Sequence, residues 1–324
     1  MAIHRASEPK RYSWENITAG EDLGWVEGVV SDFYIKMHAF AVDDYGDWYL
    51  KDSPFGGRIG HPTLLANDIL RLFFLIYDPR PPFARGLHAK NELELLRPVK
   101  LGDKVVVSGK HTEKYERRGQ KIRVVEGQAT DEAGRSFIRM RTWETVGLGS
   151  TTPVGQGTGK PSADLITGEV PTGAPVVPRA GKHVPVGAVL PSITKHTTLE
   201  QSIAFSGSVY GWVEGGAKSM RFSIHTDPED ARKRGARDGI VQGLCSAAYL
   251  SEICTNFFGP LWLTTGHLAT NFIRPVIVRD DITACGMVKR LEAEAGKTRI
   301  HLDIWCKNQN GELATVGRAS ALAE

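Results

Sequence analysis

The residues that could do chemistry gather just before two apolar segments. In the second half of the chain, His225 stands in the run Ser-Ile-His-Thr-Asp-Pro-Glu-Asp, ahead of an apolar segment that begins near Gly243. A histidine changes its charge near neutral pH, so it is suited to general acid–base work. A single histidine is more often a core residue with both ring nitrogens hydrogen-bonded. The position of His225 directly before a predicted helix favours the catalytic interpretation.

Other motifs that carry chemistry are absent or out of place. Residues 155–160 read GQGTGK, one residue short of a phosphate-binding P-loop, and Pro161 follows them. There is no GxSxG elbow, no HExxH or zinc spacing, and no Rossmann glycine pattern after a strand. The four cysteines show no CxxC pair, which favours reduced thiols. We therefore expect no metal and no bound cofactor.

Composition places the chain among ordinary globular proteins. It has 324 residues, 41% of them hydrophobic and 24% charged, and a formal net charge of +3. That balance argues against nucleic acid and anionic membranes as partners. The first twenty residues hold no apolar signal segment, and the strongest apolar run, residues 69–77, is too short to span a bilayer and contains Arg71. A cytoplasmic protein is the expectation.

The middle of the chain predicts a linker between two similar halves. Residues 147–190 are rich in Gly, Pro, Ser and Thr and poor in large apolar side chains. We expect an N-terminal domain over residues 1–146 and a C-terminal domain over residues 191–324. The halves of similar length suggest an internal repeat.

The repeat is visible in the order of the segments. Residues 66–77 and 246–258 each predict one long apolar helix, and a strand containing Arg-Pro-Val follows each. Ile59 and Ile240 are 181 residues apart, and Pro98 and Pro275 are 177 apart. Each half ends in two alternating segments around a polar turn, DEAGR or NQNGE, which is typical of an antiparallel hairpin.

These elements predict an α+β double hotdog. A helix that is apolar on nearly all sides must be enclosed, and a curved antiparallel sheet wrapped around it does this. Single hotdog modules join edge to edge, so two of them in one chain make that dimer intramolecular. Further pairing of two such chains into a homodimer stays open.

The stretch from His225 to Leu244 resembles the MaoC-like, (R)-specific enoyl-CoA hydratase family. The likeness covers most of both halves in order, and it is specific around these residues and at the two Arg-Pro-Val strands. The resemblance implies that an Asp and a His, five residues apart, act on a water that adds across an enoyl thioester. It also implies that a backbone N–H of Gly243 or Leu244, at the helix N-terminus, binds the thioester oxygen.

Comparison with the family motif makes the C-terminal half the expected site. In the first half Pro62 matches Gly243 and has no N–H, and Asp47 keeps the family's Asp position without a following His. That half is interpreted as a support copy, and Asp47 as a loop or capping carboxylate. In the second half, Ser208 stands where the Asp belongs, seventeen residues before His225.

The insertion between Ser208 and His225 supplies further candidates. Glu214 could provide the missing carboxylate, and a serine alone could orient a water. We therefore predict His225, Ser208 and Glu214 as catalytic. We predict substrate contacts from the insertion and the helix start, by Tyr210, Trp212, Gln242, Gly243 and Leu244. The basic run Arg232, Lys233, Arg234 and Arg237 could meet CoA phosphates, or could simply suit the end of a short helix.

Three functions remain in competition. The leading one is hydration of an enoyl thioester, or dehydration of a 3-hydroxyacyl thioester, on CoA or a carrier protein. The second is a hotdog thioesterase, in which a carboxylate or His directs water to the thioester carbonyl. The third is a non-catalytic subunit that binds acyl thioesters.

Overall fold

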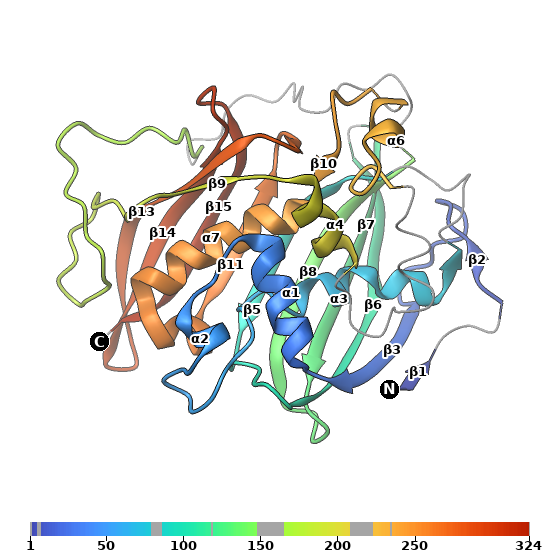
Figure 1. Cartoon of the computed structure of the whole chain (residues 1–324), viewed down its shortest axis with the longest axis horizontal. Coiled ribbons are helices and arrows are strands. Elements are labelled where there is room, and N and C mark those ends of the chain that lie inside the picture. The colour runs from blue at the N-terminus through green and yellow to red at the C-terminus, as the bar shows by residue number, and fades with distance from the viewer. Residues whose placement is uncertain are drawn as a thin grey trace.

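A single antiparallel sheet organises the molecule. The computed structural model describes residues 2–4, 8–78, 86–117, 119–147, 165–207, 223–233 and 235–323. Among these, eleven strands form one sheet in the order β1-β3-β6-β7-β8-β5-β11-β15-β14-β13-β9. The longer helices lie together on one side of this sheet (Figure 1).

The N-terminal half supplies one end of the sheet. Its strands in that sheet are β1 (Ala2–His4), β3 (Asp22–Val29), β5 (His88–Leu95), β6 (Lys104–Arg117), β7 (Gln120–Thr130) and β8 (Ser136–Val146). Its helices are α1 (Asp32–Val42), α2 (Asp47–Leu50), α3 (Ala66–Arg71) and the 3-10 helix η1 (Leu72–Leu75). The short strands β2 (Lys10–Arg11) and β4 (Tyr77–Asp78) pair apart from the main sheet.

The C-terminal half repeats the arrangement. Its strands in the main sheet are β9 (Ile193–His196), β11 (His267–Phe272), β13 (Asp281–Glu294), β14 (Lys297–Lys307) and β15 (Leu313–Ala323). Its helices are α4 (Leu199–Gly207), α6 (Pro228–Lys233), α7 (Gly243–Phe258), η2 (Gly259–Leu261) and α8 (Trp262–Thr265). Strands β10 (Ile240–Val241) and β12 (Val276–Ile277) pair separately.

The two halves join edge to edge, as predicted. Strand β5 pairs antiparallel with β11, and His267 lies opposite Glu94 at one end and Asn271 opposite Lys90 at the other. We call this strand pair the seam. It makes the two half-sheets continuous, so no strand edge of either half is left open there.

Helix α7 confirms the predicted central helix of the C-terminal half. Thirteen of its side chains are buried, and it packs against β13, β15, β14 and β11 (Figure 1). Gly259, with φ of +62°, follows it, which agrees with the preference of helix ends for glycine in the left-handed region.

The prediction of one long helix over residues 66–77 is wrong. The segment forms the six-residue α3, then a 3-10 turn, and then enters β4. Leu72 and Leu75 are both buried, and in a 3-10 turn residues three apart lie above one another. Tyr77 then continues as a strand and is fully buried. Periodicity alone does not separate these states.

Part of the segment predicted as a linker packs against the C-terminal half. The Ala180 N–H donates to Phe257 O at 2.8 Å, and Leu190 N–H donates to Gly286 O at 2.9 Å. Val184, Ala188 and Leu190 are buried. The domain boundaries stay a prediction; strand β8 ends at Val146 and β9 begins at Ile193.

Within the described ranges, no helix combines the length and the apolar character that crossing a membrane requires.

Candidate active site

His225 lies against the strand that leads into α7. The Ile240 N–H donates to Ile224 O at 2.7 Å, and His225 Nδ1 lies 2.7 Å from Ile240 O. A carbonyl oxygen only accepts, so hydrogen bonding assigns the ring proton to Nδ1. The basic nitrogen of His225 is therefore Nε2. Ile240 is two residues before Gln242, the N-cap of α7, so the histidine is held beside a helix N-terminus.

The first turn of α7 offers backbone N–H groups. Gln242 caps the helix with extended backbone angles and without a side-chain cap, and the first N–H groups of a helix lack intrahelical carbonyl partners. A Cβ at Gly243 would lie 2.9 Å from the Phe272 ring, so a larger residue would displace that ring. Glycine at this helix start therefore has a steric cause.

The predicted substrate contacts have different surroundings. The Gln242 side chain is buried and donates from Nε2 to Ser206 Oγ at 2.7 Å, so it ties α7 to α4. The Leu244 side chain lies in the core and is 1% exposed. The backbone N–H is the only hydrogen-bond donor of this residue. Gly243 is half-buried. The remaining predictions, at Ser208, Tyr210, Trp212 and Glu214, lie outside the described residues, and so does Arg234.

The basic run after His225 is paired with acids. Lys233 and Glu229 form an ion pair of 2.9 Å within one helical turn, and Arg237 pairs with Asp280. Arg232 lies 3.6 Å from Asp238. These contacts agree with the structural interpretation of the run.

Sequence reasoning missed a buried polar cluster at the end of α1. We define the α1 cluster as Asp44, Tyr49, His61, Lys195 and Glu252. The Tyr49 hydroxyl hydrogen-bonds Asp44, and His61 Nε2 lies 3.5 Å from Asp44 Oδ2. Lys195, from β9, donates to Asp43 O and pairs with Glu252 of α7 at 2.9 Å. The cluster therefore combines both halves.

Burial dominates the electrostatics of the α1 cluster. It raises the pKa of Glu252 to about 7, with the Asp44 carboxylate as the next cause, and it also raises the pKa of Asp44. Burial and then the Lys195 charge lower the pKa of His61 to about 3, so this imidazole is neutral at physiological pH.

The structure also revises the placement of the first-half Asp. Asp47 lies exposed in the first turn of α2, paired with Lys51, whereas Asp44 directly follows the C-cap of α1. Asp44 and Tyr49 are five residues apart, the spacing that the family resemblance gives for its Asp and His. That spacing was the available signal for Asp44, and it went unused because Tyr49 is not a histidine.

The cavity beside His61 has little room for a substrate. The cavity that His61 lines has a volume of about 10 Å³ and is closed by Leu65, Leu95, Phe137 and Leu263. Such a volume holds about one water. His61 is the member of the α1 cluster that lines this cavity, and the space beside its ring is too small for a substrate.

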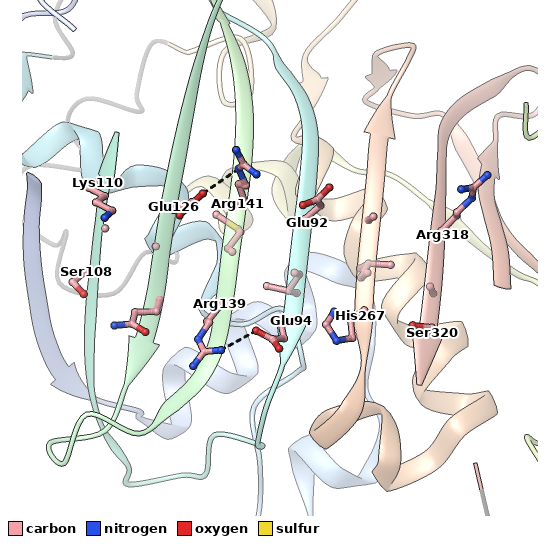
Figure 2. A pocket seen from close by; sticks show the side chains of 18 of the residues that line it. Glu92, Glu94, Ser108, Lys110, Glu126, Arg139, Arg141, His267, Arg318 and Ser320 are labelled. Atoms are coloured by element: carbon pink, nitrogen blue, oxygen red, sulfur yellow. Dashed lines mark hydrogen bonds and ion pairs between the residues drawn. The ribbon is translucent and has the colours of Figure 1, made fainter. Parts of the chain in front are cut away.

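A cavity of about 850 Å³ forms a groove on the sheet face that the helices leave open (Figure 2). Both halves line it, and its charged side chains pair across neighbouring strands. Arg139 pairs with Glu94 at 3.2 Å and Arg141 with Glu126 at 3.1 Å. Of the predicted site residues that the structure describes, none lines this groove. Its paired charges are those of a solvated sheet face.

Across the described ranges, no three His, Cys, Asp or Glu side chains are grouped as metal ligands. All four cysteines are free thiols.

The continuous antiparallel sheet that both halves build, with the longer helices on one side of it (Figure 1), defines the class: the chain is a double hotdog protein. No protein-family model and no curated protein matches its sequence. Solved structures do match. A MaoC-like dehydratase has a TM-score of 0.70 and 18% identity, over 96% of this chain and 100% of that one.

Two further structures are similar. A MaoC-like dehydratase from Phytophthora capsici gives a TM-score of 0.62 and 15% identity, over 93% of this chain and 94% of its own. A conserved hypothetical protein from Mycobacterium tuberculosis, described as a double hotdog, gives 0.62 and 14%, over 96% and 98%. These matches confirm the predicted fold, and they confirm the MaoC-like resemblance at the level of the fold.

Proposed function

We propose that this chain is a hydratase or dehydratase that acts on enoyl or 3-hydroxyacyl thioesters of CoA or a carrier protein. Its site lies in the C-terminal half. The observation that carries the proposal is the contact of 2.7 Å between His225 Nδ1 and Ile240 O, which makes Nε2 the basic nitrogen of a ring bonded two residues before the N-cap of α7. Dehydratases of the same fold support the reaction class.

The reaction needs a base and an oxyanion donor. In the hydration direction, His225 Nε2 accepts a proton from water, and the water oxygen bonds to C3 of the enoyl group. The electron pair of the C2–C3 double bond moves onto the thioester oxygen, which accepts hydrogen bonds from the N–H of Gly243 or Leu244. The enolate then takes a proton at C2 from the His225 imidazolium, which returns the histidine to its neutral form. Dehydration is the reverse sequence.

A second acid–base group completes this scheme. Glu214 is the better candidate, because a carboxylate can both orient the water and hold charge, whereas Ser208 can only orient it at neutral pH. Substituting Glu214→Gln and Ser208→Ala separates the two. A loss at Glu214 comparable to that at His225 assigns the second role to the carboxylate.

Turnover of crotonyl-CoA and longer straight-chain enoyl-CoA thioesters tests the proposal. With wild type, the absorbance of the enoyl thioester should fall and no thiol should be released. His225→Ala should lower kcat by about 100-fold or more. Two controls should retain most activity: Asp47→Asn and His196→Ala, both at exposed side chains. Thiol release would instead identify a thioesterase. Binding of CoA esters without turnover would identify a binding subunit.

A further inference from the structure

The C-terminal end of α4 is held by side chains from the N-terminal half. The last carbonyls of a helix have no partner within the helix. Here Asn67 Nδ2 donates to Phe205 O at 2.8 Å, and Arg71 Nη1 donates to Ser206 O. Both donors come from α3, more than 130 residues away in the sequence.

Helix α4 is in turn bonded to the proposed site. Ser202 Oγ donates to the backbone carbonyl of His225 at 2.7 Å. Gln242, the N-cap of α7, donates to Ser206 Oγ at 2.7 Å. Helix α4 thus lies between the α3 side chains and the two parts of the site, the His225 backbone and the start of α7.

In the reverse direction, a side chain of the C-terminal half binds the end of a helix in the N-terminal half. Lys195, from the C-terminal half, donates to Asp43 O at the end of α1. The residue that corresponds to Arg71 under the repeat spacing of 181 is Glu252, which pairs with Lys195 at 2.9 Å instead of bonding a helix end. Each half therefore supplies one buried cation to the end of a helix in the other.

Arg71 is charged and well suited to this place. It is 4% exposed, and burial lowers its pKa only to about 10, so it stays protonated at neutral pH. The Asp68 carboxylate lies close enough to oppose that lowering. A cation at a helix C-terminus is favoured by the helix dipole, and the guanidinium fixes several donors in one plane.

We propose that Arg71 and Asn67 are positioning residues of the C-terminal site. The N-terminal half, which lacks a site of its own, supplies them from α3. They hold the end of α4, and through Ser202 they fix the backbone of His225 relative to α7. The inference rests on the proposed function. It makes the N-terminal half a contributor to turnover as well as to stability.

The test compares Arg71→Gln with Lys195→Gln. Both substitutions remove a buried cation from a helix end, but only Arg71 bonds α4. On crotonyl-CoA, Arg71→Gln should lower kcat at least tenfold and change KM less than about threefold, because a misplacement of about 1 Å can cost about 100-fold. Arg71→Lys, which keeps the charge, should recover part of the loss, and Asn67→Ala should lower kcat more mildly.

Lys195→Gln should lower Tm while kcat stays within about threefold of wild type. Equal kcat losses in Arg71→Gln and Lys195→Gln would overturn the proposal, as would wild-type kcat in Arg71→Gln and in Asn67→Ala. If Arg71→Gln does not fold, the kcat values of Arg71→Lys and Asn67→Ala are compared with that of Lys195→Gln in the same way.

A second measurement separates this inference from the proposed function. The ¹⁵N signals of the His225 ring, assigned with His225→Ala, report whether Nδ1 carries the proton. Arg71→Gln should change these signals, and Lys195→Gln should not. This holds even if wild type turns over no thioester, an outcome that would contradict the proposed function alone. Unchanged His225 signals in Arg71→Gln would contradict the positioning role.

Discussion

Two threonines in one row of the sheet have opposite hydrogen-bonding states. Thr270 lies opposite Asn91 across the seam, and Asn91 lies opposite Thr142 on β8. All three are fully buried. Thr142 Oγ1 bonds His88 Nε2 at 2.6 Å, whereas Thr270 Oγ1 and the Asn91 amide have no partner in the part of the chain that the structure describes. A buried polar atom without a partner costs stability.

This contrast gives a prediction for stability. Thr270→Val keeps the side-chain shape and removes the unpartnered hydroxyl, so the free energy of unfolding should rise by about 1 kcal/mol. Thr142→Val is the matched control, and it should lower stability by about 1–2 kcal/mol, because it leaves His88 Nε2 without its partner. Urea denaturation of both variants measures the difference. A destabilised Thr270→Val would mean that the hydroxyl has a partner, such as water.

Sequence reasoning found candidate side chains that belong to a local motif. It missed side chains whose importance depends on contacts with residues far along the chain. His225 could be found because its neighbours and its place before a helix are local features. Arg71 was noticed only as a charge within an apolar run. Its partner Ser206 is 135 residues further along, and no local pattern connects them. Glu252 and Lys195 were missed for the same reason.

Elements joined by polar turns were predicted well, and elements of mixed geometry were not. The hairpins β7–β8 and β14–β15 follow from turn residues between alternating segments. The apolar run from residue 66 to 77 changes from α-helix to 3-10 helix to strand. Each of the three states contains buried apolar side chains, so the pattern of hydrophobicity could not distinguish them.

The segment before β9 gives a prediction at the scale of elements. Gly168 has a φ of +71°, and a Cβ there would lie 2.8 Å from Leu313 Cδ2 and 3.2 Å from the Trp305 ring. Gly168→Ala should therefore lower the free energy of unfolding by at least about 1 kcal/mol, from backbone strain and from this contact.

Replacing residues 155–164 with a Gly/Ser tract of equal length is the control, and it should leave activity and Tm nearly unchanged, because closure depends weakly on composition and length. Thermal unfolding of both variants makes the comparison. A large loss from the Gly/Ser tract would show that this stretch contributes contacts, contrary to its interpretation as a linker.

Among the described residues, four histidines have strongly lowered pKa values and are neutral at physiological pH. Burial is the largest cause that lowers the pKa of His38, His61, His88 and His111, to about 3 for the last three. In the unfolded chain a histidine titrates near its ordinary value of 6.5. Their contribution to stability is therefore complete above pH 6.5 and is lost as the pH falls toward 3.

We accordingly expect steep acid destabilisation. At about pH 5 each of the three deeply shifted histidines should cost about 2 kcal/mol relative to neutral pH. Three carboxyl groups act in the opposite sense, because burial raises the pKa of Asp44, Glu144 and Glu252, to about 7 for Glu252. Urea denaturation between pH 7.5 and 5 measures the slope. His61→Gln should flatten it and His196→Gln, at an exposed side chain, should not; equal slopes in all three proteins would contradict the expectation.

Arg71 and Lys195, the buried cations that each half supplies to a helix end of the other, make the two modules different from each other. In an exact repeat, positions 71 and 252 would carry the same side chain, and either module could occupy either place. With an arginine at one position and a glutamate at the other, a second copy of the C-terminal module in the N-terminal place would turn a carboxylate toward the carbonyl end of α4. The two modules are therefore not interchangeable: each carries the side chain that fits the helix end of the other module.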